Sequence, residues 1–390
     1  MRSAASSVRY VLLAVAAVAA LALSACGGGD KGGSGGSTAS SGDSGGTIKL
    51  GFDATLTGDF ASYGLMIRDG ANLAIEQLNA DGGVDGKQLE MSSQDDQGQP
   101  SNGVTNTQKL CDDKDVRAVL GWSFSSVALA AVPVLTQCRL PAIGSATTSP
   151  RLSGISPYFF RNTLTDAAQG VQMGAHAADL GFRNVAVLNG EDDFGVGTSD
   201  SFIKGFQDAG GTIAYRAGFQ PGTTDFQTQI AKVKAANADA LYIGGFYSDA
   251  ARIAKQARAA GYDGQLLSTD GALAPDLIRL GGDAVDGMLL YSTFVPGIPT
   301  PKVQDFVKAF DAKYGEKPTS AAALGYDAVF VIKQAIEAGG DSREGIAKAL
   351  ANSDWDGITG VNAFDDKHDR VAKILFIKVA GGDFVPADAK

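Results

Sequence analysis

Residues 48–83 read IKLGFDATLTGDFASYGLMIRDGANLAIEQLNADGG, and this stretch indicates the fold. Its opening segment, 48–54, is apolar and β-branched enough for a buried strand. A helix is expected over 62–80, with one apolar face formed by Ala71, Ala74, Ile75 and Leu78. Gly82 and Gly83 end that helix. A strand followed by a helix is the repeating unit of an open parallel sheet.

The same unit recurs along the chain with short turns. In the first half, strands are expected at 88–93, 117–121 and 141–144, with helices at 100–111 and 125–137. After a crossing strand at 158–161, helices are expected at 165–180, 196–209, 225–236 and 249–260, and strands at 184–188, 212–217, 240–243 and 265–268. Helices at 301–314 and 320–337 and a strand at 373–379 complete the pattern. Two such series predict an α/β protein with two parallel-sheet lobes facing each other across a cleft.

The first 46 residues differ in composition from the rest of the chain. Residues 11–23 are unbroken apolar sequence behind Arg2 and Arg9, which is typical of a secretory signal, and they are too few to span a bilayer. The tetrapeptide LSAC at 23–26 resembles the lipobox of bacterial lipoproteins. This resemblance implies that residues 1–25 are removed and that Cys26 carries diacylglycerol on its sulfur. Residues 26–46 would then be a lipidated cysteine and a flexible Gly/Ser-rich tether. A plain signal peptide with a chance cysteine is the alternative.

Composition limits the class of protein. The chain has 390 residues, of which 44% are hydrophobic and 19% charged, as in an ordinary folded globule. Its formal net charge is −10, and removing the signal removes two arginines and no acidic residue, so the mature protein is near −12. Nucleic acid is therefore not expected as a partner, because phosphate binding requires a basic surface.

Three cysteines suggest one disulfide in an exported protein. Once Cys26 is taken by lipid, Cys111 and Cys138 remain, and an oxidising exterior allows such a pair to close. Cys111 ends one expected helix and Cys138 ends the next, near the same edge of a sheet. Two buried, unpaired thiols are the alternative.

The residues needed for catalysis or for a metal site are scarce. The chain has only two histidines, His176 inside an expected helix and His368 in an acidic turn, so no histidine-based triad or two-histidine metal site can be assembled. Four pairs of adjacent carboxylates are expected to be solvated loop charge: Asp95-Asp96, Asp112-Asp113, Asp192-Asp193 and Asp365-Asp366. No enzymatic activity and no metal are therefore expected.

One glycine-rich turn imitates a nucleotide-binding loop. Gly195 and Gly197 lie where a helix follows a strand, as in a dinucleotide site, but Asp200 takes the place of the third glycine. An aspartate there would repel pyrophosphate, so we expect no nucleotide cofactor, and indeed no cofactor of any kind.

The loops that follow the expected strands contain hydroxyls and aromatic rings. Ligands of open α/β sheets bind beyond the carboxyl ends of the strands, and Ser125 and the run 145–148 both lie there. A helix start with free N–H groups favours an anion such as a carboxylate. From the opposite lobe, Asp270 offers a carboxylate to a cation, beside the rings of Phe194 and Phe246. An α-amino acid with an apolar side chain would satisfy both sides, although each serine taken alone could simply cap a helix.

An ordered set of short motifs resembles the periplasmic branched-chain amino-acid-binding proteins over residues 48–379. The motifs are Leu56-Thr57-Gly58, Tyr63-Gly64, Gly70-Ala71, Ile75, Asn79, Gly82-Gly83, Asp95-Asp96, Leu120-Gly121, Ser125-Ser126, Pro141-Ala142-Ile143, Ala146-Thr147, Phe194-Gly195, Gly244-Gly245-Phe246, Asp270-Gly271 and Gly325-Tyr326-Asp327. The resemblance implies a type I periplasmic binding protein fold, with two lobes joined by a three-crossover hinge. It places lobe 1 at 47–165 plus 294–370, and lobe 2 at 166–293 plus 371–390.

The resemblance also implies roles for individual residues. Ser125 and Thr147 would hydrogen-bond an α-carboxylate, and Asp270 would counter the α-ammonium, which would also donate to the backbone carbonyl of Ser145. The pocket-lining residues implied by the same positions are Tyr63, Phe124, Ala146, Phe194 and Phe246. Three of these positions depart from the well-known leucine, isoleucine and valine binders. Phe124 replaces a disulfide-bonded cysteine, Phe194 replaces a tyrosine, and Asp270 replaces a longer glutamate.

The function implied is capture of a small amino acid outside the cytoplasm and its delivery to an ABC importer. The expected partners are a permease, an ATPase and the membrane that holds the lipid anchor, and the protein is expected to be a monomer. The alternatives are a sensor of the same fold, and a binder of an amide or of an aromatic or aliphatic acid. A sensor would normally carry a fused transmembrane or output domain, which argues for transport.

Overall fold

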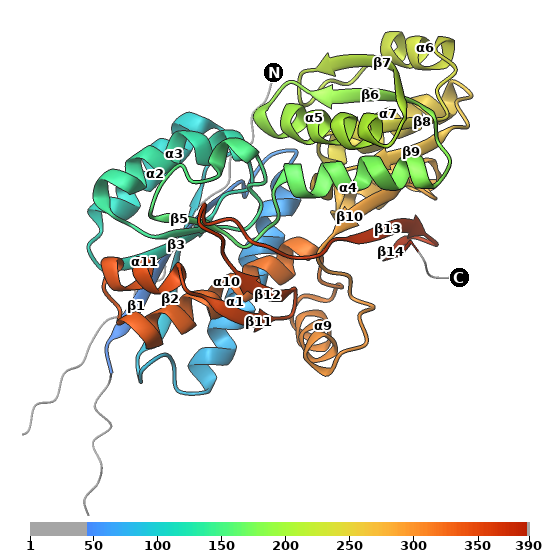
Figure 1. Cartoon of the computed structure of the whole chain (residues 1–390). Coiled ribbons are helices and arrows are strands. Elements are labelled where there is room, and N and C mark those ends of the chain that lie inside the picture. Colours follow the sequence, from blue (N-terminus) through green and yellow to red (C-terminus); the bar gives the residue numbers. More distant parts are fainter. Residues whose placement is uncertain (1–44, 388–390) are drawn as a thin grey trace, which may run out of the picture. The chain divides into compact units, whose positions relative to one another are not determined.

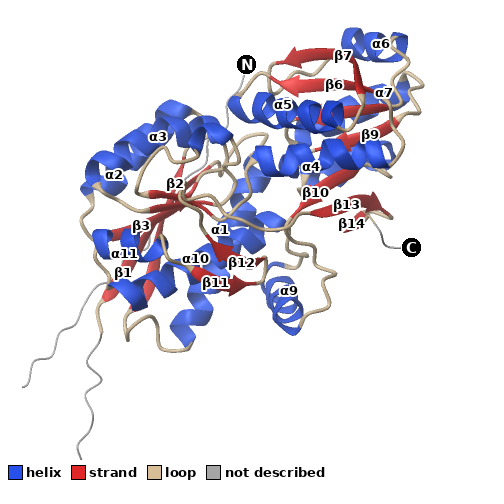
Figure 2. Ribbon diagram, viewed as in Figure 1, coloured by secondary structure: helices blue, strands red, loops and turns tan. Residues whose placement is uncertain are grey.

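The computed structural model describes residues 45–387, and its first sheet is built by the segments that the sequence pattern predicts (Figures 1 and 2). The strands run parallel in the order β2-β1-β3-β4-β5. Their bounds are β1 (Thr47–Ala54), β2 (Gln88–Asp95), β3 (Val116–Gly121), β4 (Ala142–Gly144) and β5 (Phe159–Arg161). The connecting helices are α1 (Ala61–Ala80), α2 (Pro100–Asp112) and α3 (Ser125–Cys138). Helices α2 and α3 cover one face, and α1 covers the other (Figure 1).

The second sheet has the order β14-β13-β10-β9-β8-β6-β7. Its first five strands in the chain are parallel: β6 (Asn184–Gly190), β7 (Thr212–Phe219), β8 (Ala240–Gly244), β9 (Gln265–Ser268) and β10 (Leu289–Ser292). Two antiparallel strands extend it, β13 (Leu375–Ala380) and β14 (Asp383–Pro386). The helices around this sheet are α4 (Asp166–Asp179), α5 (Asp193–Asp208), α6 (Gln227–Ala235), α7 (Tyr247–Ala259) and α8 (Pro275–Gly281).

The remaining elements return to the first sheet before the chain ends. They are α9 (Pro301–Tyr314), α10 (Ser320–Gly339), α11 (Arg343–Leu350) and the hairpin of β11 (Asp354–Gly357) and β12 (Gly360–Ala363). The chain thus passes between the sheets after β5, after β10 and before β13. These three crossings, with two mainly parallel sheets, are the predicted type I fold.

Two glycines explain how α1 and α10 pack so closely on one another. A Cβ atom on Gly70 would lie only 1.9 Å from the carbonyl oxygen of Ala322. A Cβ atom on Gly325 would lie 2.1 Å from the carbonyl oxygen of Ile67. Both positions therefore exclude any side chain, because real Cβ contacts of this length do not occur. The two glycines allow α10 to lie directly against α1, although α10 follows the second sheet in sequence.

Several element bounds differ from the sequence prediction. The helix predicted to start at residue 196 begins at Asp193, because the Asp192 side chain accepts hydrogen bonds from the N–H groups of Phe194 and Gly195, at 2.9 and 2.8 Å. The strand predicted at 373–379 is β13. Elements that the pattern did not predict are β10, β11, β12, β14, α8 and α11. Each of these is a strand of four residues or a helix of seven or eight residues, too short for a clear period.

The prediction of solvated charge is wrong for two of the carboxylates. Asp96 is fully buried, and its Oδ1 accepts hydrogen bonds from Thr55 Oγ1 and Gly98 N, both at 2.7 Å. Asp192 is half-buried as the cap of α5. A carboxylate buried in this way is held by the N–H and O–H donors that surround it. Most of these donors are backbone N–H groups two or three residues further along the chain, and only the Thr55 hydroxyl comes from a distant segment.

The structure contains a disulfide between Cys111, in the last turn of α2, and Cys138, at the end of α3, with the two Cα atoms 5.8 Å apart. The predicted signal peptide, Cys26 and nearly all of the tether lie outside the described residues. Within residues 45–387, no helix combines the length and apolar character needed to cross a membrane.

Candidate functional site

The first side of the site is built where β3 and β4 end. Ser125 is the first residue of α3, and its Oγ accepts a hydrogen bond from Ser149 N at 3.2 Å. Ser145 follows β4, and its N–H donates to the carbonyl of Gly121 at 2.9 Å. The two loops are therefore tied together, and they place Ser125, Ser145 and Thr147 on one edge of the sheet.

Thr147 lies directly over the end of β4. A Cβ atom on Gly144 would be 2.2 Å from Thr147 Oγ1, so this hydroxyl occupies the space that a side chain would need. Within the described residues, the buried hydroxyls of Ser145, Thr147 and Thr148 have no hydrogen-bond partner. Buried polar atoms in proteins normally have a partner, so these three hydroxyls mark a place suited to a polar ligand.

Asp270 stands at the opposite side. It follows β9 and begins a single 3-10 turn, and 8% of its surface is exposed. Its Oδ2 accepts a hydrogen bond from Gln169 Nε2 at 3.2 Å. Burial raises the pKa of the Asp270 carboxyl to about 6, so near neutral pH the group is largely ionised. Tyr63 of α1 is buried close to Asp270. Burial raises the pKa of the Tyr63 phenol, and the negative charge of Asp270 raises it further.

Sequence reasoning missed a second carboxylate beside Asp270. Asp166, the first residue of α4, is fully buried, and neither of its carboxylate oxygens has a hydrogen-bond partner among the described residues. Its N–H donates to the carbonyl of Thr148 at 2.8 Å, so it adjoins the hydroxyl loop. Burial, and then the charge of Asp270, raise the pKa of Asp166 well above its usual value. Asp166 lies just after the predicted crossing strand, where the chain passes from the first sheet to the second. Ligands of α/β sheets bind at such switch points, so this position could have singled out Asp166 from the sequence.

Aromatic rings from both sides close over these groups. The ring centroids of Phe124 and Phe246 are 4.6 Å apart, and those of Phe194 and Phe246 are 4.8 Å apart. Phe60, which was not predicted, contacts Phe124 at 5.8 Å and Phe246 at 5.6 Å. A Cβ atom on Gly271 would be 2.7 Å from Phe194, so this glycine allows the ring to lie beside Asp270.

Further contacts join the two sides outside the rings. The hydroxyl of Tyr247 donates to the carbonyl of Asp59 at 2.9 Å, and Arg252 pairs with the Asp59 carboxylate at 3.3 Å. Asp59 precedes α1 on the first side, whereas Tyr247 and Arg252 belong to α7 on the second. The structure therefore shows the two sides of the site in direct contact.

The predicted residues thus fall into two facing groups. Ser125, Ser145, Ala146 and Thr147 are buried on the first side with Tyr63 and Phe124, and Phe194, Phe246 and Asp270 are buried on the second. Ala146, with 8% of its surface exposed, also packs in the core around β1 and β4. No cluster of three potential metal ligands occurs among residues 45–387. The site offers hydroxyls on one side, carboxylates on the other and an apolar wall between them.

A fold of two lobes with a polar site between them is typical of solute-binding proteins. Residues 47–383 match the periplasmic binding protein family. A leucine-, isoleucine-, valine-, threonine- and alanine-binding protein of Pseudomonas aeruginosa is 32% identical over 329 residues, which are 83% of this chain and 87% of that protein.

Solved structures agree with this match. A leucine-binding protein of Thermotoga maritima is 31% identical with a TM-score of 0.82, covering 87% of this chain and 97% of that one. A solute-binding protein of an R. palustris ABC transporter, solved with benzoate, also has a TM-score of 0.82, covering 87% and 95% of the two chains, but at 21% identity it supports the fold alone. The chain belongs to the periplasmic binding proteins, in the family of branched-chain amino-acid binders.

Proposed function

We propose that this chain is the extracytoplasmic, lipid-anchored solute-binding protein of an ABC importer, and that it delivers a small α-amino acid, branched-chain or related, to a membrane permease. The observation that carries the proposal is the polarity of the site. Unpartnered hydroxyls of Ser145 and Thr147 lie on one side, and the carboxylate of Asp270 lies on the other. A zwitterion matches this polarity, because it brings an anion to the hydroxyls and a cation to the carboxylate.

The roles follow from the chemistry of each group. Ser125 and Thr147, with N–H groups at the start of α3, would bind the α-carboxylate. Asp270 and the carbonyl of Ser145 would receive the α-ammonium, with Asp166 as a further acceptor close by. The side chain of the ligand would lie against the apolar wall, made by Tyr63, Phe124, Phe194 and Phe246. The relative from P. aeruginosa, whose name includes leucine, isoleucine and valine, supports an apolar amino acid.

Capture would depend on closure of the two lobes. A ligand that bridges the hydroxyls of one side and the carboxylate of the other makes all of its contacts only when the sides meet, so it binds the closed arrangement better than an open one. The cross-cleft contacts of Asp59 with Tyr247 and Arg252 would add to this preference. A permease could then distinguish the closed, loaded protein from the open one.

A second candidate ligand is an aromatic or aliphatic acid without an ammonium group. The observation that favours it is the wall of phenylalanine rings around Phe246, including Phe194 in the place of a tyrosine. Such a ligand would leave Asp270 without a cation. A sensor that signals through a membrane partner is the remaining alternative for the role, and neighbouring permease and ATPase genes would favour transport.

A thermal-shift screen of the purified mature protein tests the ligand class. It should include amino acids, amides, short-chain acids and aromatic acids. A ligand that binds only the folded form raises the melting temperature by mass action, so leucine, isoleucine or valine should give the largest shifts. Shifts from benzoate alone, with none from any amino acid, would contradict the proposal of a zwitterion and favour the second candidate.

The anchor and the lobe boundaries are proposals of their own. Cys26→Ser should release the protein from the membrane in a form that still binds ligand, because the tether separates the anchor from the fold. Fractionation and acyl labelling measure this, and unchanged membrane association would count against the anchor. We also propose the lobes as 47–165 plus 294–370, and 166–293 plus 371–390.

A further inference from the structure

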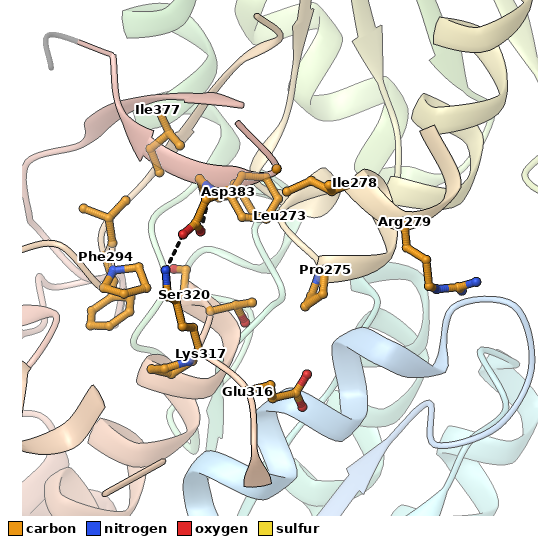
Figure 3. A pocket seen from close by; sticks show the side chains of 16 residues that line it. Leu273, Pro275, Ile278, Arg279, Phe294, Glu316, Lys317, Ser320, Ile377 and Asp383 are labelled. Carbon is orange, nitrogen blue, oxygen red and sulfur yellow. Dashed lines mark hydrogen bonds and ion pairs between the residues drawn. The ribbon is translucent and has the colours of Figure 1, made fainter. Parts of the chain in front are cut away.

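A cavity lies away from the proposed amino-acid site. Its volume is about 430 Å³, and its lining comes from α8, from the crossover that follows β10, from the loop between α9 and α10, and from the β13–β14 hairpin (Figure 3). None of the residues assigned above to the amino-acid site lines it. An occupant would touch the second sheet, the crossover and the loop that leads into α10 at the same time.

Most of the wall is apolar. Leu273, Phe294 and Ile377 are almost fully buried and face the cavity, and Ile278 and Phe384 complete this part of the lining (Figure 3). A cavity of this size and composition matches small-molecule sites, which are concave, mostly apolar and hold a few polar groups that orient the ligand.

The polar groups gather at one end, where α10 begins. Thr319 lines the cavity and precedes α10, a helix of 20 residues, but its side chain makes no capping hydrogen bond. Its Oγ1 is buried and has no partner among the described residues, although only 8% of the Thr319 surface is exposed. Free N–H groups at a helix start attract anions, and the unpartnered hydroxyl beside them can donate to the same anion.

The charged residues of the lining strengthen this polarity. Lys317, two residues before Thr319, forms an ion pair with Asp383 of β14 and supplies a cation at the same end (Figure 3). Glu316 lies where the cavity meets a neighbouring one between α1 and α8, which shares Pro275 and Arg279 with it. Two carboxylates therefore line the cavity, and that of Asp383 is neutralised by its ion pair with Lys317.

We propose that this cavity is a second ligand site, for a small monocarboxylate with an apolar body such as a medium-chain fatty acid. The apolar body would lie against Leu273, Phe294 and Ile377. The carboxylate would accept hydrogen bonds from Thr319 Oγ1 and from the first N–H groups of α10, with Lys317 close by. This site uses none of the residues assigned to the amino-acid site.

Isothermal titration with octanoate tests the proposal on the full mature chain. Thr319→Val keeps the shape of the side chain and removes only the unpartnered hydroxyl, so it should weaken octanoate at least tenfold without loss of melting temperature. Thr300→Val is the matched control, because Thr300 also precedes a helix, α9, without a capping hydrogen bond, and it does not line the cavity. Thr300→Val should leave octanoate affinity unchanged.

A second variant blocks the cavity rather than its polar end. Ile278 is only partly buried, so Ile278→Trp can fill the space without disturbing the core, and it should abolish octanoate binding. Thr147→Val, in the amino-acid site, should leave octanoate binding intact. Octanoate binding that survives Ile278→Trp but disappears in Thr147→Val would place the acid in the amino-acid site and overturn the proposal. Absence of any octanoate binding to the wild type at millimolar concentration would also overturn it.

Discussion

The two sides of the amino-acid site differ in the charge that they present. The first side, from the ends of β3 and β4, offers hydroxyls and helix N–H groups, and the residues assigned to it include no carboxylate. The second side, from the start of α4 and the end of β9, offers Asp166 and Asp270. Both sides are equally buried, so the difference is one of chemistry rather than of exposure. A site divided in this way is suited to a ligand that carries both charges.

The site residues also differ in whether their side chains already have a hydrogen-bond partner within the protein. Ser125 already serves the fold, because it holds the Ser149 loop through its hydroxyl. Thr147 and Asp166 have no hydrogen-bond partner on their side chains among the described residues. Substitutions at partnered and unpartnered positions should therefore separate structural from binding effects.

The largest effect is expected from the acidic side. Asp270→Asn removes the charge that would meet the ligand ammonium and keeps the shape, so it should weaken binding of a zwitterion by about 3 kcal/mol, or roughly a hundredfold. Calorimetric titration with leucine measures the change. Asp286→Asn, on an exposed carboxylate, is the matched control and should bind like the wild type. Wild-type affinity in Asp270→Asn would mean that the ligand carries no cation at that place.

A smaller effect is expected from the hydroxyl side. Thr147→Val should weaken binding by about 1.5 kcal/mol, or roughly tenfold, because one hydrogen bond to a carboxylate is lost while the volume is kept. The melting temperature of the ligand-free protein should not fall, since that hydroxyl has no partner to lose.

Ser125→Ala provides the contrast on the same side. It should weaken binding similarly and also lower the melting temperature, because the Ser149 N–H loses its acceptor. Equal melting temperatures for Ser125→Ala and the wild type would show that the bond to Ser149 adds nothing to stability.

The pH dependence should distinguish the two sides. The pKa of Asp270 is raised by burial to about 6, so below that pH the carboxyl is protonated and cannot pair with an ammonium. Affinity for a zwitterion should fall by up to about tenfold for each pH unit below 6. Stability of the ligand-free protein should change in the opposite sense, because a raised folded-state pKa makes stability fall as pH rises from about 4 to 6. Titrations from about pH 4 to pH 8 measure both trends. The slope in affinity should disappear in Asp270→Asn, and a slope that remains there would assign it to another group.

The smallest effect is expected from the wall between the sides. Phe194→Tyr adds a hydroxyl next to Phe246 and Gly271, where an aliphatic side chain is expected to lie. An apolar ligand should bind about threefold to tenfold more weakly unless the hydroxyl finds a partner. Leucine and threonine affinities measured side by side give the change in preference. If leucine affinity is unchanged, Phe194 does not face the ligand side chain.

Most of the fold could be predicted from the sequence, because its signals are local. The apolar strand and amphipathic helix at the start of the folded part became β1 and α1, and the strand at 265–268 has the predicted bounds. Turn glycines and periodic apolar residues act over a few positions, so the pattern alone reveals them. The ends of β3, β4 and β9 also follow from the pattern, which is why Ser125, Thr147 and Asp270 could be singled out.

What the sequence did not reveal depends on contacts between distant segments. Residues 375–386 join the second sheet as antiparallel strands beside β10. Their own sequence pattern does not predict which strand they pair with. Asp166 looks like an ordinary first-turn acid of a helix, and only the packing of Thr148 and Asp270 around it makes it a buried, unpartnered carboxylate. The sequence by itself determined the fold class, the strand ends and the kinds of groups at the site. The tertiary structure alone decided which of those groups are buried together, because burial and electrostatic environment come from neighbours far away in the chain.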